Sequence, residues 1–162
     1  MIEPRIDDLL EHVDDPLTFI DDSLRPVAAP RTAVLVGVPA HPLLFSDHDR
    51  ALGHFRRYRP GELLAQVRGW IDVVEHGPLF ASLVAPRAAS VAVERIRSRA
   101  AAGAAADTVD THDHGAGDWQ GGPTLTRAVA GVLAADAAAT RRLGGVGRRL
   151  PGLSHWVFGR VR

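Results

Sequence analysis

Short apolar runs alternate along the chain with apolar positions at helical spacing. Residues 33–38 form a continuous, largely β-branched apolar run between turn residues, which is typical of a strand covered on both faces in a parallel sheet. A buried helix is the alternative, but the run is short for a helix. Residues 70–74 alternate loosely and residues 154–161 have strand composition, so both segments are predicted as strands.

Helical patterns lie between these runs. Asp15 and Pro16 predict a helix start, because Asp15 can cap free backbone N–H groups and proline fits the first helical position. A second helix is predicted from Pro60, with Gly69 supplying the left-handed residue that ends it.

Two longer helices are predicted further along the chain. Residues 79–100 fit one of them, with Pro86 expected to kink or split it and Arg87 on its solvent side. The other begins at Pro123. Residues 101–122 are rich in Ala, Gly, Asp and His, and this composition predicts a flexible loop. The order of elements predicts one α/β domain over residues 1–162.

Composition excludes several classes of protein. The 162 residues carry no net charge, so nothing favours nucleic acid or an anionic membrane as a partner. Cysteine is absent, which excludes disulfides, thiolate nucleophiles and Cys-type zinc sites. No apolar run approaches the length of a membrane span, and the polar N-terminus is unlike a signal peptide. The expected location is therefore the cytoplasm.

Several motifs resemble one branch of the class I S-adenosylmethionine-dependent methyltransferases. Residues 8–15 are similar to the family's D-x-L-E-H-x-x-D segment, and residues 36–42 to its V-x-V-P-A-x-P strand. The spacing D-x-x-x-x-H-x-R-R-Y follows within residues 45–58 and is the most specific signal. Two later segments, 118–127 and 150–154, also resemble this branch.

The resemblance implies a Rossmann-like sheet of seven strands in the order 3-2-1-4-5-7-6, with the last strand antiparallel. This chain is expected to supply the tip of strand 4 and strands 5, 6 and 7, with flanking helices. The family's glycine-rich cofactor loop, G-x-G-x-G, is absent from the sequence. We therefore expect a truncated C-terminal half with an open edge at strand 5, which a homodimer or a complementing methyltransferase chain would cover.

The resemblance also assigns candidate site residues. It places Glu11 and His12 beside the methionine end of S-adenosylmethionine, with His12 as a general base; in the alternative interpretation both merely cap or orient the next helix. The loop over the same edge would form the pocket for a small-molecule methyl acceptor, or else an internal salt-bridge network. Its candidate residues are His41, Asp47, Asp49, His54, Arg56, Arg57 and Tyr58.

Metal binding is not expected. Groups of possible ligands surround His48 and lie around His112 and His114, and the second group lacks a rigid scaffold and regular ligand spacing. Three functions remain open: methyl transfer to an unidentified small molecule, a non-catalytic remnant or partner subunit of a complete methyltransferase, and a cofactor-free module that binds the acceptor.

Overall fold

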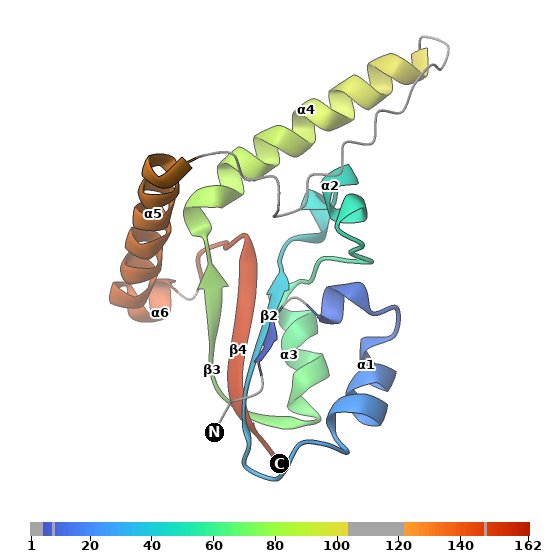
Figure 1. Cartoon of the computed structure of the whole chain (residues 1–162), viewed down its shortest axis with the longest axis vertical. Coiled ribbons are helices and arrows are strands. Elements are labelled where there is room, and N and C mark those ends of the chain that lie inside the picture. Colours follow the sequence, from blue (N-terminus) through green and yellow to red (C-terminus); the bar gives the residue numbers. More distant parts are fainter. Residues whose placement is uncertain (1–4, 8, 104–121, 148) are drawn as a thin grey trace.

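The protein is described by a computed structural model over residues 5–7, 9–103, 122–147 and 149–162. Its centre is a four-stranded sheet in the order β1-β2-β4-β3, with helices around it (Figure 1), so the architecture is mixed α/β. The strands are β1 (Arg5–Asp7), β2 (Ala33–Pro39), β3 (Ile71–Leu79) and β4 (Ser154–Val161).

Strand directions in this sheet are mixed. β1 pairs with β2 in parallel, whereas β4 lies antiparallel to both β2 and β3. Consequently β1, β2 and β3 run in one direction and β4 alone runs in the other. The carboxyl ends of β1 and β2 therefore meet at the same edge of the sheet.

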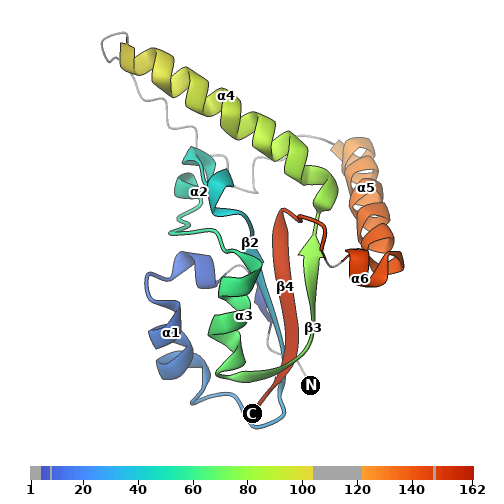
Figure 2. The ribbon, with the colours of Figure 1, turned by 180° about the vertical axis from the view of Figure 1, so that it is seen from behind.

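Helices of different lengths connect and cover the strands. The long helix α4 extends away from the sheet, whereas α5 and α6 lie beside β3 (Figures 1 and 2). The helices are α1 (Pro16–Phe19), α2 (Asp47–Ala51), α3 (Pro60–Arg68), α4 (Val84–Gly103), α5 (Gly122–Arg142) and α6 (Gly144–Gly147). The shorter turns are η1 (Leu10–His12), η2 (Ile20–Leu24), η3 (Pro42–Leu44) and η4 (Ala81–Leu83), of which η2 is π-helical and the others are 3₁₀.

The core lies between one face of the sheet and the helices α1 and α3. Side chains of a strand alternate between the two faces, and Val34, Val36 and Val38 of β2 are all buried. Leu63 and Val67, one turn apart on α3, pack against this face. The core also contains Leu10, Ile20, Tyr58, Trp70, Ile71, Val157 and Val161.

Several predicted elements are confirmed. The apolar run at 33–38 is a strand, and the tail strand spans the predicted residues. The carboxylate of Asp15 accepts hydrogen bonds from the backbone N–H groups of Leu17 (3.1 Å) and Thr18 (3.2 Å), so it caps α1 as expected. Gly69, in contrast, ends α3 in the right-handed conformation (φ −69°). The prediction of a left-handed glycine there is wrong.

The segment around Pro86 also differs from the prediction. β3 continues to Leu79, so α4 begins at Val84 rather than at Leu79. Pro86 falls in the first turn of α4, where a backbone N–H would have no partner within the helix. It therefore neither kinks nor splits the helix. Ile96 is 65% exposed on the projecting part of α4.

The edge of β2 that was expected to be open is covered in part. Leu35, Val36 and Gly37, three of the seven residues of β2, pair with the three residues of β1, so the prediction of an open edge is wrong over this stretch. Most of the predicted loop at 101–122 lies outside the described residues. Within the described residues, no helix combines the length and hydrophobicity that crossing a membrane requires.

Candidate functional site

Glu11 and His12 lie at the carboxyl end of β1. The chain leaves β1 and forms the 3₁₀ turn η1, whose three residues differ in burial. Leu10 packs into the core, and Glu11 is fully buried beside it. His12 is exposed. This turn therefore presents a carboxylate from within the fold and an imidazole at its surface.

The segment after α2 folds back onto this turn. Gly53 adopts a left-handed conformation (φ 76°), which favours glycine. The backbone N–H of Phe55 then donates to the Glu11 carbonyl at 2.7 Å, and the Tyr58 hydroxyl donates to the Leu10 carbonyl at 2.9 Å. These bonds hold the turn η1 and residues 53–58 against each other.

Three side chains converge at this junction. Glu11, His12 and His54 each offer one oxygen or nitrogen atom, and these three atoms lie within 4.8 Å of one another. The rings of His12 and His54 meet edge to face, with centroids 4.6 Å apart and an interplanar angle of 81°. We call Glu11, His12 and His54 the junction cluster.

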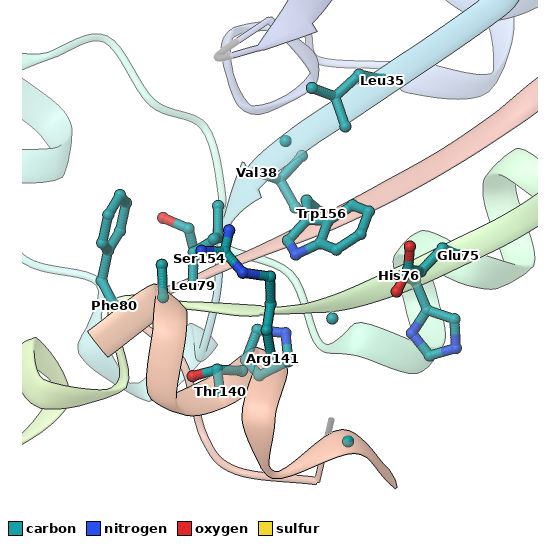
Figure 3. Close-up of a pocket in the computed structure, with 15 residues that line it drawn as sticks. Leu35, Val38, Glu75, His76, Leu79, Phe80, Thr140, Arg141, Ser154 and Trp156 are labelled. Carbon is teal, nitrogen blue, oxygen red and sulfur yellow. The ribbon is translucent and has the colours of Figure 1, made fainter. Parts of the chain in front are cut away.

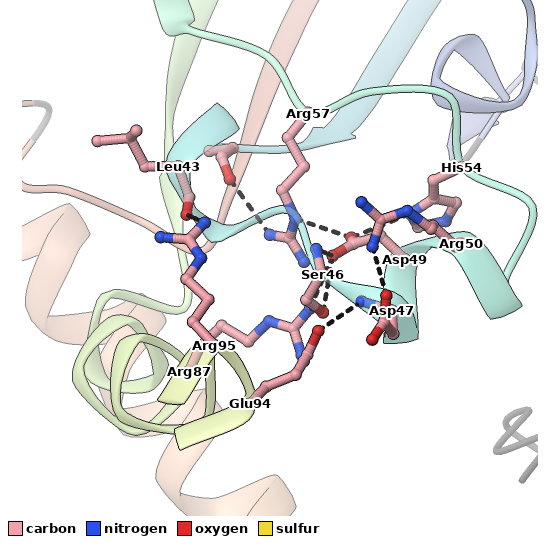
Figure 4. A network of polar contacts seen from close by, with 11 residues as sticks. Leu43, Ser46, Asp47, Asp49, Arg50, His54, Arg57, Arg87, Glu94 and Arg95 are labelled. Carbon is pink, nitrogen blue, oxygen red and sulfur yellow. Dashed lines mark hydrogen bonds and ion pairs between the residues drawn. The ribbon is translucent and has the colours of Figure 1, made fainter. Parts of the chain in front are cut away.

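A buried ion-pair network borders the junction cluster (Figure 4). Its centre is Asp49 of α2, whose side chain is completely buried. One carboxylate oxygen accepts from Arg57 Nε at 2.8 Å, and the other accepts from Arg87 Nη2 at 2.7 Å. The second oxygen also accepts from the backbone N–H of Ser46 at 3.0 Å. His54 Nδ1 lies 3.4 Å from the first oxygen, so the network reaches the junction cluster directly.

Burial and charge set the protonation states in this region. Burial raises the pKa of Asp49, but the Arg57 and Arg87 guanidinium groups outweigh it and hold that pKa below its usual value. Burial lowers the pKa of His54, and the opposing effect of Asp49 is smaller. Burial also raises the pKa of Tyr58 to about 12. Near neutral pH, Asp49 is therefore ionised, His54 is a neutral imidazole and Tyr58 is a hydrogen-bond donor.

The predicted acceptor residues separate into two groups. Asp49 and Arg57 are buried, and Arg57 also donates from Nη1 to the Ala40 carbonyl at 3.2 Å. These contacts agree with the alternative interpretation of the sequence, in which the loop residues form an internal salt-bridge network. The Tyr58 hydroxyl likewise donates to a backbone carbonyl. Acceptor binding by these residues stays a prediction.

The remaining predicted residues are not members of the junction cluster. Asp47 is exposed and pairs with Arg50. Arg56 donates to the Asp14 backbone carbonyl. His41 follows β2 and lies near buried His155, whose pKa falls to about 4 through burial and then through the nearby His76 and His41.

Arg87 is a member of the network that the sequence did not reveal. The prediction placed it on the solvent side of a helix, whereas its side chain is only 14% exposed and reaches Asp49, 38 positions away in the sequence. That prediction is wrong because Arg87 Nη2 donates to the Ser46 hydroxyl and to the Asp49 carboxylate, at 2.7 Å each. No local spacing of residues indicates such a contact.

A separate cavity of about 720 Å³ lies between the sheet and α5 (Figure 3). Leu35 and Trp156 line its sheet side, on the face opposite to the core, and Arg141 of α5 reaches toward them. Gly77 lies against the indole, and a Cβ added there would be in van der Waals contact with Trp156 Nε1 at 3.4 Å. No predicted site residue lines this cavity, and no sequence pattern had indicated it.

Comparison with known proteins does not assign the chain to a family. The sequence matches no protein-family model, and a search of the curated proteins finds no match.

Proposed function

We propose that this chain forms the C-terminal half of a class I methyltransferase fold and takes part in methyl transfer from S-adenosylmethionine to a small molecule. The observation that carries this proposal is the topology of the sheet. The order β1-β2-β4-β3, with β4 alone antiparallel, corresponds to strands 4-5-7-6 of the fold that the resemblance implies.

The position of the junction cluster supports the same proposal. In open α/β sheets, ligands bind outside the carboxyl ends of the parallel strands. Glu11 and His12 follow the carboxyl end of β1, and His54 joins them from the loop after β2. The cluster therefore lies where a cofactor and its acceptor would meet in such a fold.

The proposed chemistry requires little from the protein beyond positioning. The acceptor's lone pair forms a bond to the methyl carbon while the carbon–sulfur bond breaks, and S-adenosylhomocysteine leaves. Exposed His12 would accept the proton that a hydroxyl or amine acceptor loses. The buried network around Asp49 would keep the loop that carries His54 in place.

A second candidate function is that of a partner subunit, because β1 is a short strand. Among the residues that the structure describes, β1 pairs only with β2. A methyltransferase chain that carries a glycine-rich loop could add a strand to the other side of β1. Such a chain would supply the cofactor loop that this sequence lacks.

Calorimetric titration of the 162-residue chain with S-adenosylhomocysteine tests the proposal. Micromolar binding that is weakened in His12→Ala, but not in the control His48→Ala, supports cofactor binding at the junction cluster. His48 is a suitable control because it is an exposed histidine on α2. An absence of heat from a chain with normal circular dichroism would refute independent cofactor binding and favour the partner-subunit function.

A further inference from the structure

The junction cluster combines the ligand types of a transition-metal site. It contains one carboxylate and two imidazoles, supplied by two separate segments. Two histidines and one carboxylate form a frequent protein ligand set for divalent ions of the first transition row. We propose that Glu11, His12 and His54 bind one such ion.

The distances in the cluster are close to those that coordination requires. With metal–ligand bonds of about 2.1 Å, two ligand atoms on one ion are at most about 4 Å apart. The three candidate atoms already lie within 4.8 Å of one another, so a shift of less than about 1 Å brings them into range. His12 is exposed, and rotation of its side chain can supply this shift without disturbing the core.

Asp49 orients His54 as a metal ligand. Histidines that bind metals usually donate their other ring N–H to a carboxylate, which fixes the tautomer and the ring orientation. The Asp49 carboxylate faces His54 Nδ1 at 3.4 Å and favours the tautomer with hydrogen on that nitrogen. The lone pair then resides on Nε2.

The charge around Glu11 is also compatible with a cation. Glu11 is fully buried, and burial of a carboxylate is costly unless positive charge lies nearby. Arg57 interacts electrostatically with Glu11, so one positive charge already lies near this carboxylate. A divalent ion between Glu11 and the two imidazoles would add positive charge beside this carboxylate.

The proposed metal site does not depend on the proposed methyl transfer, but it restricts how methyl transfer could proceed at this site. One lone pair of His12 cannot both bind an ion and accept a proton. With the ion bound, proton removal from an acceptor would instead follow from direct coordination of that acceptor, which lowers its pKa. The exposure of His12 places the open coordination positions toward solvent.

Titration of the metal-free 162-residue chain with Co²⁺ tests the proposal, by calorimetry for stoichiometry and by visible absorption for ligand type. One equivalent is expected, with the ligand-field bands of nitrogen and oxygen coordination. His12→Ala should weaken the affinity about tenfold or more, because it removes a direct ligand. His12→Ala is suitable because an exposed side chain contributes little to folding.

Two control variants make the result decisive. His48→Ala removes an exposed histidine outside the cluster, and the double variant His112→Ala, His114→Ala removes a His-x-His sequence that could chelate an ion by itself. Both controls should bind Co²⁺ as the unmodified chain does. Absence of binding to the folded chain, or loss of binding in the double variant but not in His12→Ala, would overturn the proposal.

Discussion

Replacement of Asp49 by asparagine tests whether the buried network holds the site together. Both oxygens of this carboxylate accept hydrogen bonds, one from Arg57 and the other from Arg87 and the Ser46 backbone. An asparagine has nearly the same shape, but it replaces one acceptor oxygen by an NH₂ donor. In Asp49→Asn the new NH₂ group therefore faces other hydrogen-bond donors, and the guanidinium groups of Arg57 and Arg87 lose their negative partner.

The cost follows from the burial of the partners. The Arg57 side chain is 6% exposed and the Arg87 side chain 14%, so neither charge regains much hydration when its partner is removed. Removing one partner of a buried ion pair costs about 3 to 5 kcal/mol. This loss is a large part of the about 5 to 15 kcal/mol by which a domain is stable.

Asp47→Asn is the matched control, because Asp47 precedes Asp49 by two residues on the same helix. Its partner in the exposed pair is Arg50, and the Asp47 side chain is 71% exposed. Such pairs contribute about 0 to 1 kcal/mol. Urea denaturation followed by tryptophan fluorescence at pH 7.5 measures both variants. Equal losses of less than about 1 kcal/mol in the two variants would show that the network does not stabilise the fold.

Three further predictions concern stability. Burial holds the pKa of His155 at about 4 in the folded chain, so between about pH 6.5 and 4 only the unfolded chain protonates this imidazole. The free energy of unfolding should therefore fall by about 2.5 kcal/mol from pH 7 to 4.5. Urea titrations of His155→Gln should lack this part of the loss. Tyr58→Phe leaves a buried backbone carbonyl of η1 without its hydroxyl donor and should cost about 1 to 3 kcal/mol in the same assay; an unchanged midpoint would exclude that bond as a stabilising contact. Gly159→Ala would place a Cβ 2.5 Å from the Asp72 carbonyl oxygen and should lower the thermal midpoint, whereas at Gly61 an added Cβ meets no atom within 4 Å and alanine should leave the midpoint unchanged or higher.

Elements that depend on local sequence could be predicted. The apolar run of β2 and the tail strand β4 have compositions that few other structures accommodate. The cap of α1 likewise depends only on Asp15 and the residues just after it. The start of α4 could not be predicted, because Leu79 and Phe80 suit either a strand end or a helix start. Pairing with β4 decides in favour of the strand.

Contacts between distant segments account for what the sequence could not predict in the site. Glu11, His12 and the later loop residues were selected individually, but their spacing does not reveal that His54 meets His12 edge to face. Arg87 was placed on the solvent side of its helix. Its true environment depends on α2, which lies far from it in the sequence.

The structure gives the spacing D-x-x-x-x-H-x-R-R-Y a physical explanation. Asp49 faces His54 five positions later and Arg57 eight positions later, and Tyr58 then donates to the turn that carries Glu11. One aspartate thus fixes an imidazole and a guanidinium, and the tyrosine holds this loop against η1. Whatever ligand the junction cluster holds, its geometry depends on this motif. Asp49→Asn should therefore weaken Co²⁺ binding even under conditions in which the variant remains folded.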